Sequence, residues 1–219
     1  AAAYTAYVVF VGGDGLPMYR FFVPVLGFFG LLTAYGAEAW RTRLCLRPAF
    51  VRIGLALMVA AIAWAARPNF SGPDRAYIQQ DISEVSAWKA IGLWFKENAA
   101  PSDTLAVLPA GAMPYFSGLP TIDMLGLNDT VIAHTPVRMG QGQAGHEKYN
   151  LPYLLQRAPT YFVIGVYGLA PKPLDPQRMV MPYYPVERAL LTSGAFLGNY
   201  RAELAETPAG YFIYFKRTR

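Results

Sequence analysis

The chain has 219 residues, of which 54% are hydrophobic and 15% charged, with a formal net charge of +5. Apolar residues are concentrated in residues 1–66, so we expect a membrane region followed by a water-facing domain. The scattered basic residues argue against a nucleic-acid partner, and the single cysteine, Cys45, excludes an intrachain disulfide framework.

Apolar stretches in the first third predict two complete membrane spans and part of a third. Residues 1–11 are apolar but too short to cross a bilayer, and residues 12–20 form a polar corner. Residues 21–37 and 49–66 have the length and composition of complete spans. No signal peptide is recognisable, and the chain starts without Met inside an apolar stretch. We therefore expect the C-terminal part of a longer multi-span protein.

The connection between the two spans predicts the topology. Residues 38–48 carry Arg41, Arg43 and Arg47, and an excess of arginine and lysine in a short loop marks the cytoplasmic side. The corner at residues 12–20 and everything after the second span then lie outside the cytoplasmic membrane. This places the corner and the water-facing domain in the same compartment.

Residues 67–219 predict an extracytoplasmic α/β domain that is large enough to bury its own core. A connecting segment rich in Pro, Gly and Ser at residues 67–84 precedes a helix over 85–99. The further predicted elements are strands at 104–108, 121–125 and 161–166, short helices at 111–117 and 151–157, loops at 128–149 and 167–185, and a hairpin of 200–205 with 211–216. The first two strands are expected to form a parallel unit with a short crossover, and 161–166 a central strand.

Two motifs in the loop at 128–149 match known patterns only in part. Residues 140–145 match the dinucleotide pattern G-x-G-x-x-G, but no strand precedes them and no helix follows, so we interpret them as a glycine loop. His146 and Glu147 resemble the start of a zinc H-E-x-x-H motif, but position 150 is Asn. The second ligand is therefore absent, and no metal site is predicted.

Polar side chains follow the strand predicted at residues 121–125. Asp123, Asn128 and Asp129 lie at or just after its end, where open α/β sheets tend to place ligand-binding groups. These side chains are therefore candidates for binding a substrate. The alternative is a turn at the end of the strand that the same side chains cap.

The polar corner contains an acid, Asp14, and an arginine, Arg20, at the mouth of a span. Charged residues in such a position are rare unless they are functional. Asp14 could accept a proton from a sugar hydroxyl, and Arg20 could bind a lipid-linked phosphate. The alternative is an interfacial helix cap, in which Asp14 caps the span and Arg20 extends to the lipid headgroups.

Three motifs together resemble a class of membrane enzymes. They are Val-Gly-Gly-Asp-Gly-Leu-Pro-Met-Tyr-Arg-Phe-Phe-Val-Pro from Val11, Ala-Gly-Ala-Met-Pro-Tyr-Phe-Ser-Gly from Ala110, and Thr-Ile-Asp-Met-Leu-Gly-Leu-Asn-Asp from Thr121. With this spacing, the chain resembles the C-terminal part of bacterial multi-span glycosyltransferases of the GT-C class, in particular the group related to terminal arabinofuranosyltransferases. The resemblance extends from the corner to about residue 165.

The resemblance implies a polyprenyl-phosphate sugar as the donor and a glycan, lipid or protein of the cell envelope as the acceptor. Transfer would take place on the outer face of the bacterial cytoplasmic membrane. Asp14 would lie at the mouth of the active site as a catalytic candidate, and Arg20 would bind the donor phosphate. The expected acceptor-binding residues are Asp123, Asn128, Asp129, His146, Glu147 and Lys148.

The same resemblance places the principal catalytic acid upstream, so these residues alone are expected to be inactive. No cofactor is implied besides the donor substrate, and a need for a divalent metal stays open. A non-enzymatic, membrane-anchored glycan-binding module is the main alternative. A transporter or assembly subunit fits less well, because neither predicted span has an acid or a base at its centre.

Overall fold

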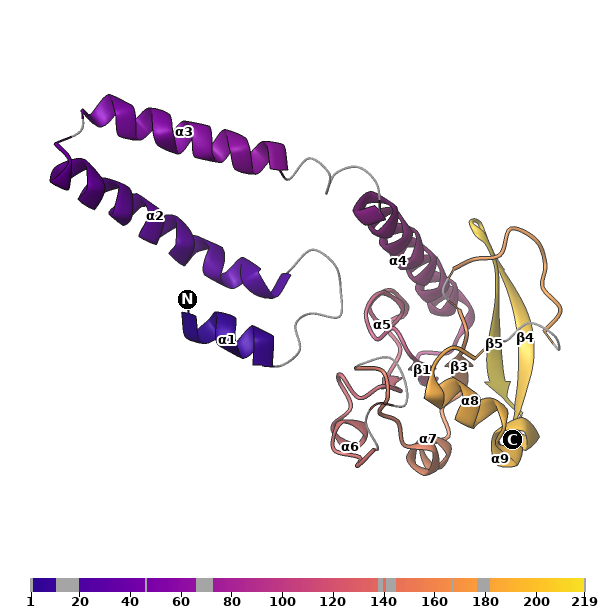
Figure 1. The fold of residues 1–219 in the computed structure, drawn as a ribbon. Helices are drawn as coiled ribbons and strands as arrows, with labels where there is room; N and C mark the ends of the chain where they lie inside the picture. Colours follow the sequence, from indigo (N-terminus) through magenta and orange to yellow (C-terminus); the bar gives the residue numbers. More distant parts are fainter. Residues whose placement is uncertain are drawn as a thin grey trace. The chain divides into compact units, whose positions relative to one another are not determined.

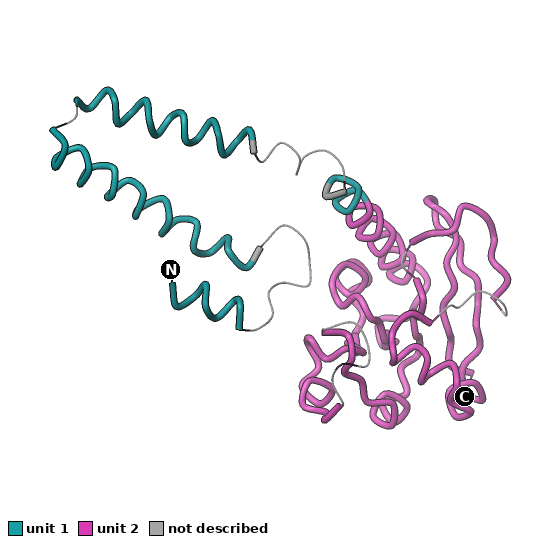
Figure 2. Tube along the Cα trace, viewed as in Figure 1, with its two compact units in different colours: residues 1–79 teal, residues 80–219 magenta. Residues whose placement is uncertain are grey.

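The structure is a computed structural model that describes residues 2–10, 20–45, 47–65, 73–137, 140, 145–166, 168–176 and 182–218. The chain divides into two compact units, Ala1–Gln79 and Gln80–Arg219 (Figure 2). The first unit contains the apolar helices, and the second contains a β-sheet with the helices that cover it.

The first unit consists of helices in the order that the sequence predicts. They are α1 (Ala2–Phe10), the 3-10 helix η1 (Arg20–Phe22), α2 (Val23–Arg43) and α3 (Pro48–Ala65) (Figure 1). Within the described residues, one helix is long and apolar enough to cross a membrane, and this is α2. The apolar run of α3, Pro48–Trp64, is shorter, so the second complete span stays a prediction.

Large apolar side chains on α2 and α3 are exposed. They include Phe28, Leu31 and Leu32 on α2, and Leu57 and Ile62 on α3, each more than half exposed. Leu26 and Phe29 of α2 are exposed as well, at 59% and 43%. At about 100° of rotation per residue, Leu26, Phe28, Phe29 and Leu31 point to different sides, so the apolar surface extends around α2. Such a surface is typical of helices that lipid or another apolar partner covers.

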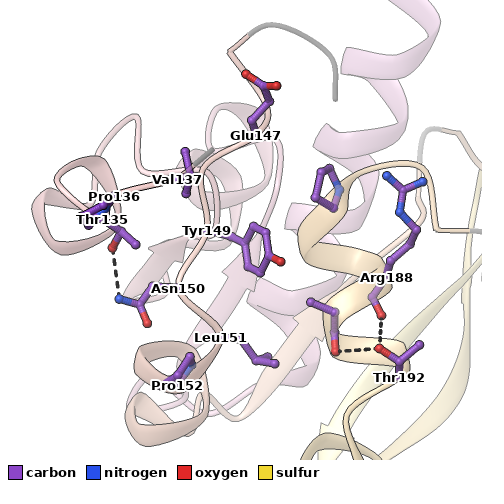
Figure 3. A pocket seen from close by; sticks show the side chains of 12 residues that line it. Thr135, Pro136, Val137, Glu147, Tyr149, Asn150, Leu151, Pro152, Arg188 and Thr192 are labelled. Carbon is purple, nitrogen blue, oxygen red and sulfur yellow. Dashed lines mark hydrogen bonds between the residues drawn. The ribbon is translucent and has the colours of Figure 1, made fainter. Parts of the chain in front are cut away.

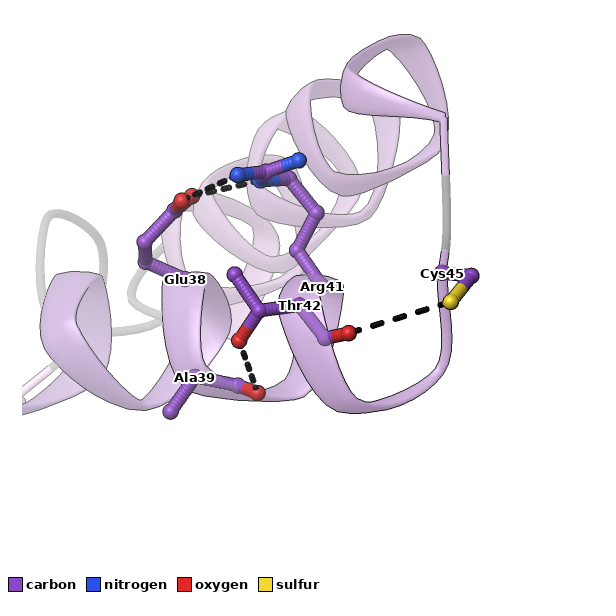
Figure 4. Close-up of polar contacts among 5 residues, drawn as sticks. All are labelled: Glu38, Ala39, Arg41, Thr42 and Cys45. Carbon is purple, nitrogen blue, oxygen red and sulfur yellow. Dashed lines mark hydrogen bonds and ion pairs between the residues drawn. The ribbon is translucent and has the colours of Figure 1, made fainter.

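The connection predicted at residues 38–48 is mostly helical, which corrects the boundary of the first span. α2 continues to Arg43, and Arg41 donates two hydrogen bonds of 2.7 and 2.5 Å to the Glu38 carboxylate one turn earlier (Figure 4). This i,i+3 pair stabilises the last turns of the helix. The next helix begins at Pro48, a residue that the first turn tolerates.

The connecting segment predicted at residues 67–84 is also helical over its described part. α4 extends over Pro73–Asn98, so the helix predicted at 85–99 is its C-terminal half. A proline in the first turn of a helix costs no hydrogen bond, because the amide there has no partner within the helix. Pro73 can therefore be the first residue of α4. Within the helix, Gln80 Nε2 donates to Glu84 Oε1 at 2.9 Å.

The second unit is built on a mixed sheet of five strands in the order β2-β1-β3-β5-β4. The strands are β1 (Leu105–Val107), β2 (Thr121–Asp123), β3 (Tyr161–Val163), β4 (Tyr200–Thr207) and β5 (Gly210–Arg217). β1 pairs in parallel with β2 and β3, and β5 pairs antiparallel with β3 and β4. The predicted parallel unit, the central position of β3 and the C-terminal hairpin are confirmed.

Short helices connect and follow the strands. They are α5 (Ala112–Ser117), α6 (Thr130–Ala133), α7 (Leu151–Arg157), α8 (Pro185–Leu191) and α9 (Gly194–Asn199). α5 and α7 match the two predicted short helices. α6 lies in a predicted loop, and α8 and α9 lie where no helix was expected.

Helices cover both faces of the sheet, which makes the second unit a three-layer α/β domain (Figure 1). On one face, Ile91 and Phe95 of α4 pack in one cluster with Leu105 and Val107 of β1. On the other face, Ala106 packs in a second cluster with residues of α6, α7, α8 and α9. This alternation along β1 follows from the period of two residues in a strand.

Candidate functional site

The order of the parallel strands creates a switch point at the carboxyl ends of β1 and β3. The crossover from β1 to β2 runs through α5 on one face of the sheet, and the return from β2 to β3 runs through α6 and α7 on the other. The two connections therefore lie on opposite faces of the sheet, and open α/β sheets tend to bind ligands at the carboxyl ends of the strands where the connections change face. Asp123 lies at this edge, at the end of β2.

Asp123, at the end of β2, builds the turn that follows it. Its side chain is only 3% exposed, and the carboxylate accepts hydrogen bonds from the amides of Leu125 at 2.9 Å, Gly126 at 3.2 Å and Asn128 at 2.7 Å. Of the two predicted roles for Asp123, substrate binding or capping of a turn at the strand end, these hydrogen bonds match the capped turn. The side chain of Asn128 itself is exposed.

Asp129 caps α6 and joins it to α7. Its Oδ1 accepts from the amides of Val131 and Ile132, both at 3.0 Å, and its Oδ2 accepts from the Tyr153 hydroxyl at 3.0 Å. Burial, and then the hydrogen bond to Asp129, raise the pKa of Tyr153, so the phenol stays a donor at neutral pH. The carboxylate therefore holds two helices of the crossover in place.

His146, Glu147 and Lys148 point to different parts of the domain. The His146 ring stacks on Tyr184, with ring centroids 4.7 Å apart. Glu147 is buried, and its Oε1 accepts from the Gly140 amide at 2.6 Å, while Lys148 Nζ donates to the Ala133 carbonyl. These contacts fasten the loop before α7 and do not bring the three side chains together.

Glu187, a residue that the sequence analysis did not single out, is fully buried in α8. Its Oε1 accepts from the Gly165 amide at 2.6 Å, and its Oε2 accepts from the amides of Tyr183 at 2.7 Å and Tyr184 at 3.0 Å. Glu187 thus joins the exit of β3 to the start of α8. A glutamate two residues after Pro185 is a helix-start pattern that the sequence does contain.

Two predicted site residues lie at or beyond the limits of the description. Asp14 lies outside the described residues. For Arg20 only the backbone is described, as the first residue of η1. Their predicted roles at a donor site therefore stay predictions.

A cavity of about 720 Å³ lies between the connection from α6 to α7, the first turn of α7, and α8 (Figure 3). The start of α8 adjoins the carboxyl end of β3, because Glu187 near that start accepts a hydrogen bond from the Gly165 amide just after β3. Apolar side chains form about half of the lining of this cavity, among them Val137, Leu151, Pro152, Pro185 and Ala189. The volume is within the range of small-molecule sites. A second cavity, of about 220 Å³, shares Glu147 with the first.

The polar side chains of the larger cavity differ in whether they already have a hydrogen-bond partner. Two of them do: the Thr192 hydroxyl donates to the Arg188 carbonyl at 2.8 Å, and Thr135 Oγ1 accepts from Asn150 Nδ2 at 3.1 Å. In contrast, the Tyr149 hydroxyl and the Arg188 guanidinium have no polar partner among the described residues. The cavity therefore offers the ring and hydroxyl of Tyr149 and the cation of Arg188, in a mixed polar and apolar lining that also includes the Glu147 carboxylate.

The described residues contain no group of three or more His, Cys, Asp or Glu side chains that could hold a metal ion. Gly140 and Gly145 have positive φ angles of 85° and 82°, and residues 145–150 are irregular, so no helix follows the glycines as a dinucleotide site requires.

Comparison with known families covers the region just described. Residues 75–214 match the family model described as Domain of unknown function (DUF8728). The chain belongs to this family. No curated protein and no solved structure matches the chain.

The DUF8728 match begins in α4 and ends in β5, so it includes residues of all five strands and every segment that lines the cavity. Residues 1–74, with the apolar helices of the first unit, lie outside the match. The DUF8728 domain is thus the α/β domain together with most of α4, and its cavity is the candidate site.

Proposed function

We propose that the chain is part of a bacterial membrane glycosyltransferase and that its DUF8728 domain binds the acceptor. In this proposal, α2 and α3 lie in the cytoplasmic membrane and the domain lies on its outer face. The apolar surface of α2 and the arginines near the end of that helix support the membrane assignment. The three motifs that resemble GT-C glycosyltransferases support the reaction.

The observation that carries the acceptor role is the cavity with Tyr149 and Arg188. An aromatic ring can pack against the C–H face of a sugar, and a guanidinium forms strong paired hydrogen bonds with a carboxylate or phosphate. The buried carboxylates nearby accept hydrogen bonds from backbone amides instead. The domain is therefore equipped to hold a ligand, and the chemistry belongs to the membrane part.

In the reaction, a carboxylate removes the proton of the acceptor hydroxyl as its oxygen attacks the anomeric carbon of the donor. The bond from that carbon to the phosphate oxygen breaks, and the polyprenyl phosphate leaves. Arg20 would stabilise the charge that develops on the phosphate, and Asp14 would shape the mouth of the site. If Asp14→Asn and Arg20→Ala leave transfer by the whole gene product unchanged, these two roles are wrong.

The acceptor role is tested by titrating the chain, in detergent micelles, with two sets of short oligosaccharides. One set is neutral, and the other carries carboxylate or phosphate groups. We expect Arg188→Ala to weaken binding of the charged set about tenfold or more and to spare the neutral set, because one charge-assisted hydrogen bond is lost. Tyr149→Ala should weaken binding of both sets.

Arg201→Ala is the matched control, because Arg201 is exposed on the edge strand β4. It should bind both sets as the unchanged protein does. Equal binding by the Arg188→Ala, Tyr149→Ala and unchanged proteins would show that the cavity is not the acceptor site.

A second candidate function is a membrane-anchored glycan-binding module without catalytic activity. The specific observation in its favour is that Asp123, Glu147 and Glu187, the buried carboxylates in the described part of the domain, each accept hydrogen bonds from backbone amides. The two functions differ in the fate of a radiolabelled polyprenyl-phosphate sugar. The glycosyltransferase transfers the label to an acceptor, and the module only retains the acceptor.

A further inference from the structure

We propose that the DUF8728 domain docks on a lipid bilayer through a strip of surface side chains on α4 and α5, all of them exposed except the half-buried Phe116. The inference rests on the membrane attachment in the proposed function, but not on glycosyl transfer. We call this surface the α4–α5 strip. It consists of Ile82, Val85, Lys89, Leu93, Tyr115 and Phe116.

The α4 part of the strip follows the helical repeat. Ile82, Val85, Lys89 and Leu93 are spaced by three or four residues and therefore lie on one side of the helix. Ile82 is 54% exposed and Val85 is 49% exposed. Ile91, with no exposed surface, marks the opposite side, which faces the core. The strip is thus a second apolar face, which the fold leaves uncovered.

α5 extends the strip because it packs closely against α4. A Cβ atom on Gly92 would lie 2.8 Å from the Met113 carbonyl oxygen and 3.0 Å from Phe116 Cβ, so glycine permits this approach. As a result, Lys89 Nζ lies 5.1 Å from the centre of the Phe116 ring. The Tyr115 and Phe116 rings are 5.0 Å apart, and Tyr115 is 81% exposed. The two helices therefore present one continuous surface.

The composition of the strip fits the interface of a bilayer. Aliphatic side chains enter the boundary with the acyl chains, tyrosine prefers the headgroup level, and lysine can bury its stem while its ammonium group reaches lipid phosphate. None of the six residues of the strip is acidic. Beyond Leu93, the exposed Lys96 continues the side that carries Lys89, and the exposed Glu97 lies at its margin. Protein interfaces, in contrast, are depleted in lysine. Charge and apolarity together therefore favour an anionic lipid surface.

The length of the covalent connection limits how far from the end of α3 the helix α4 can begin. α3 ends at Ala65 and α4 begins at Pro73, so eight peptide links (73 − 65) join them. A fully extended chain of that length spans at most about 30 Å. If α3 lies in the bilayer, as proposed above, α4 begins within reach of its surface.

The test places a fluorophore on the strip in the whole chain, reconstituted into vesicles that contain phosphatidylglycerol. The label is attached to Val85→Cys in a Cys45→Ser background, and the matched control carries it at Arg201→Cys on the edge strand β4. We expect a blue shift and quenching by doxyl-labelled lipids at position 85, and neither at position 201. In vesicles without doxyl lipids, the blue shift at position 85 should disappear when the labelled protein also carries Lys89→Glu and Lys96→Glu. It should remain when the labelled protein carries Lys172→Glu instead.

Other outcomes overturn the proposal. Equal emission and quenching at positions 85 and 201 would mean that the strip does not contact lipid. A blue shift at position 85 without quenching by doxyl lipids would mean that protein covers the strip, such as a second copy of the chain. Loss of transfer activity is not part of this readout, so a failure of the proposed glycosyltransferase function is distinguishable from a failure of docking.

Discussion

At the scale of single residues, the carboxylates of the domain act through the backbone. Asp123 accepts from three amides after β2, Asp129 from two amides in α6, and Glu187 from three amides around the start of α8. Each fixes a loop at the carboxyl edge of the sheet. None of the three lines the larger cavity, so their contribution to it is to hold the neighbouring loops and helix starts in place.

Glu187 gives the sharpest test of this role. In Glu187→Ala, three amides in a buried region lose their acceptor, and we expect a loss of about 3 kcal/mol in the free energy of unfolding. Glu187→Gln should also destabilise, because one carboxylate oxygen that accepts a hydrogen bond becomes an NH2 group. Urea denaturation in detergent micelles measures both changes.

Glu97→Ala, at an exposed position of α4, is the control and should change stability by less than about 0.5 kcal/mol. A similarly small effect at Glu187 would contradict the account.

Gly126 tests how closely the turn after β2 approaches α6. Its φ is +80°, and a Cβ atom there would lie 2.6 Å from the Ala133 nitrogen. Gly118 also has a positive φ, +68°, but a Cβ atom there meets nothing within 4 Å. Gly118→Ala should therefore cost about 1 kcal/mol for backbone strain alone, and Gly126→Ala should cost clearly more. Equal losses in thermal or urea denaturation would show that the close approach does not matter.

At the scale of elements, the packing of α5 on α4 depends on one glycine. At an open helix position, glycine to alanine stabilises by about 1 kcal/mol, as we expect for Gly198→Ala in α9, where a Cβ atom meets nothing within 4 Å. Gly92→Ala should instead destabilise, because the new methyl group meets the backbone of Met113. Stability curves of the two variants should therefore shift in opposite directions. A stabilising Gly92→Ala would contradict the described packing.

The elements that sequence reasoning predicted correctly are those with a local pattern. The buried runs around Leu105 and Phe162, the helix at 151–157 and the hairpin at 200–216 each have a clear period or a turn between two strands. The start of α4 was missed because Pro73 was interpreted as part of a loop. α8 was missed because its stability depends on Glu187, whose partners include Gly165, a residue distant in sequence.

The candidate site was predictable only in part. The turn that Asp123 builds was stated as an alternative, since an acid at a strand end commonly binds nearby amides. The cavity could not be predicted, because its lining comes from segments around Thr135, Tyr149 and Arg188 that only the fold brings together. None of these three residues has a recognisable motif.

At the scale of the whole molecule, buried tyrosines make stability depend on alkaline pH. Burial raises the pKa of Tyr200 to about 12, and burial together with a hydrogen bond to Glu203 raises the pKa of Tyr214. The unfolded value is about 10, so the folded state holds these protons more tightly. Their contribution to stability is fully present below about pH 10 and is lost as the pH rises towards 12.

We therefore expect the urea midpoint of the chain to fall as the pH is raised above about 10. Tyr200→Phe should reduce this fall, because one of the responsible phenols is gone. Tyr115→Phe is the matched control, because Tyr115 is exposed, and it should follow the unchanged protein. Identical pH profiles for Tyr200→Phe and the unchanged protein would contradict the assignment.

The whole molecule combines an apolar helical unit with a DUF8728 domain that has a ligand-sized cavity. The central claim is that the domain holds the acceptor while the membrane part transfers the sugar. Kinetics of the whole gene product, with a radiolabelled polyprenyl-phosphate sugar and an anionic glycan acceptor, test it most directly. We predict that Arg188→Ala raises KM for the acceptor about tenfold and leaves kcat nearly unchanged. An unchanged KM, or no transfer by the unmodified protein, would contradict the claim.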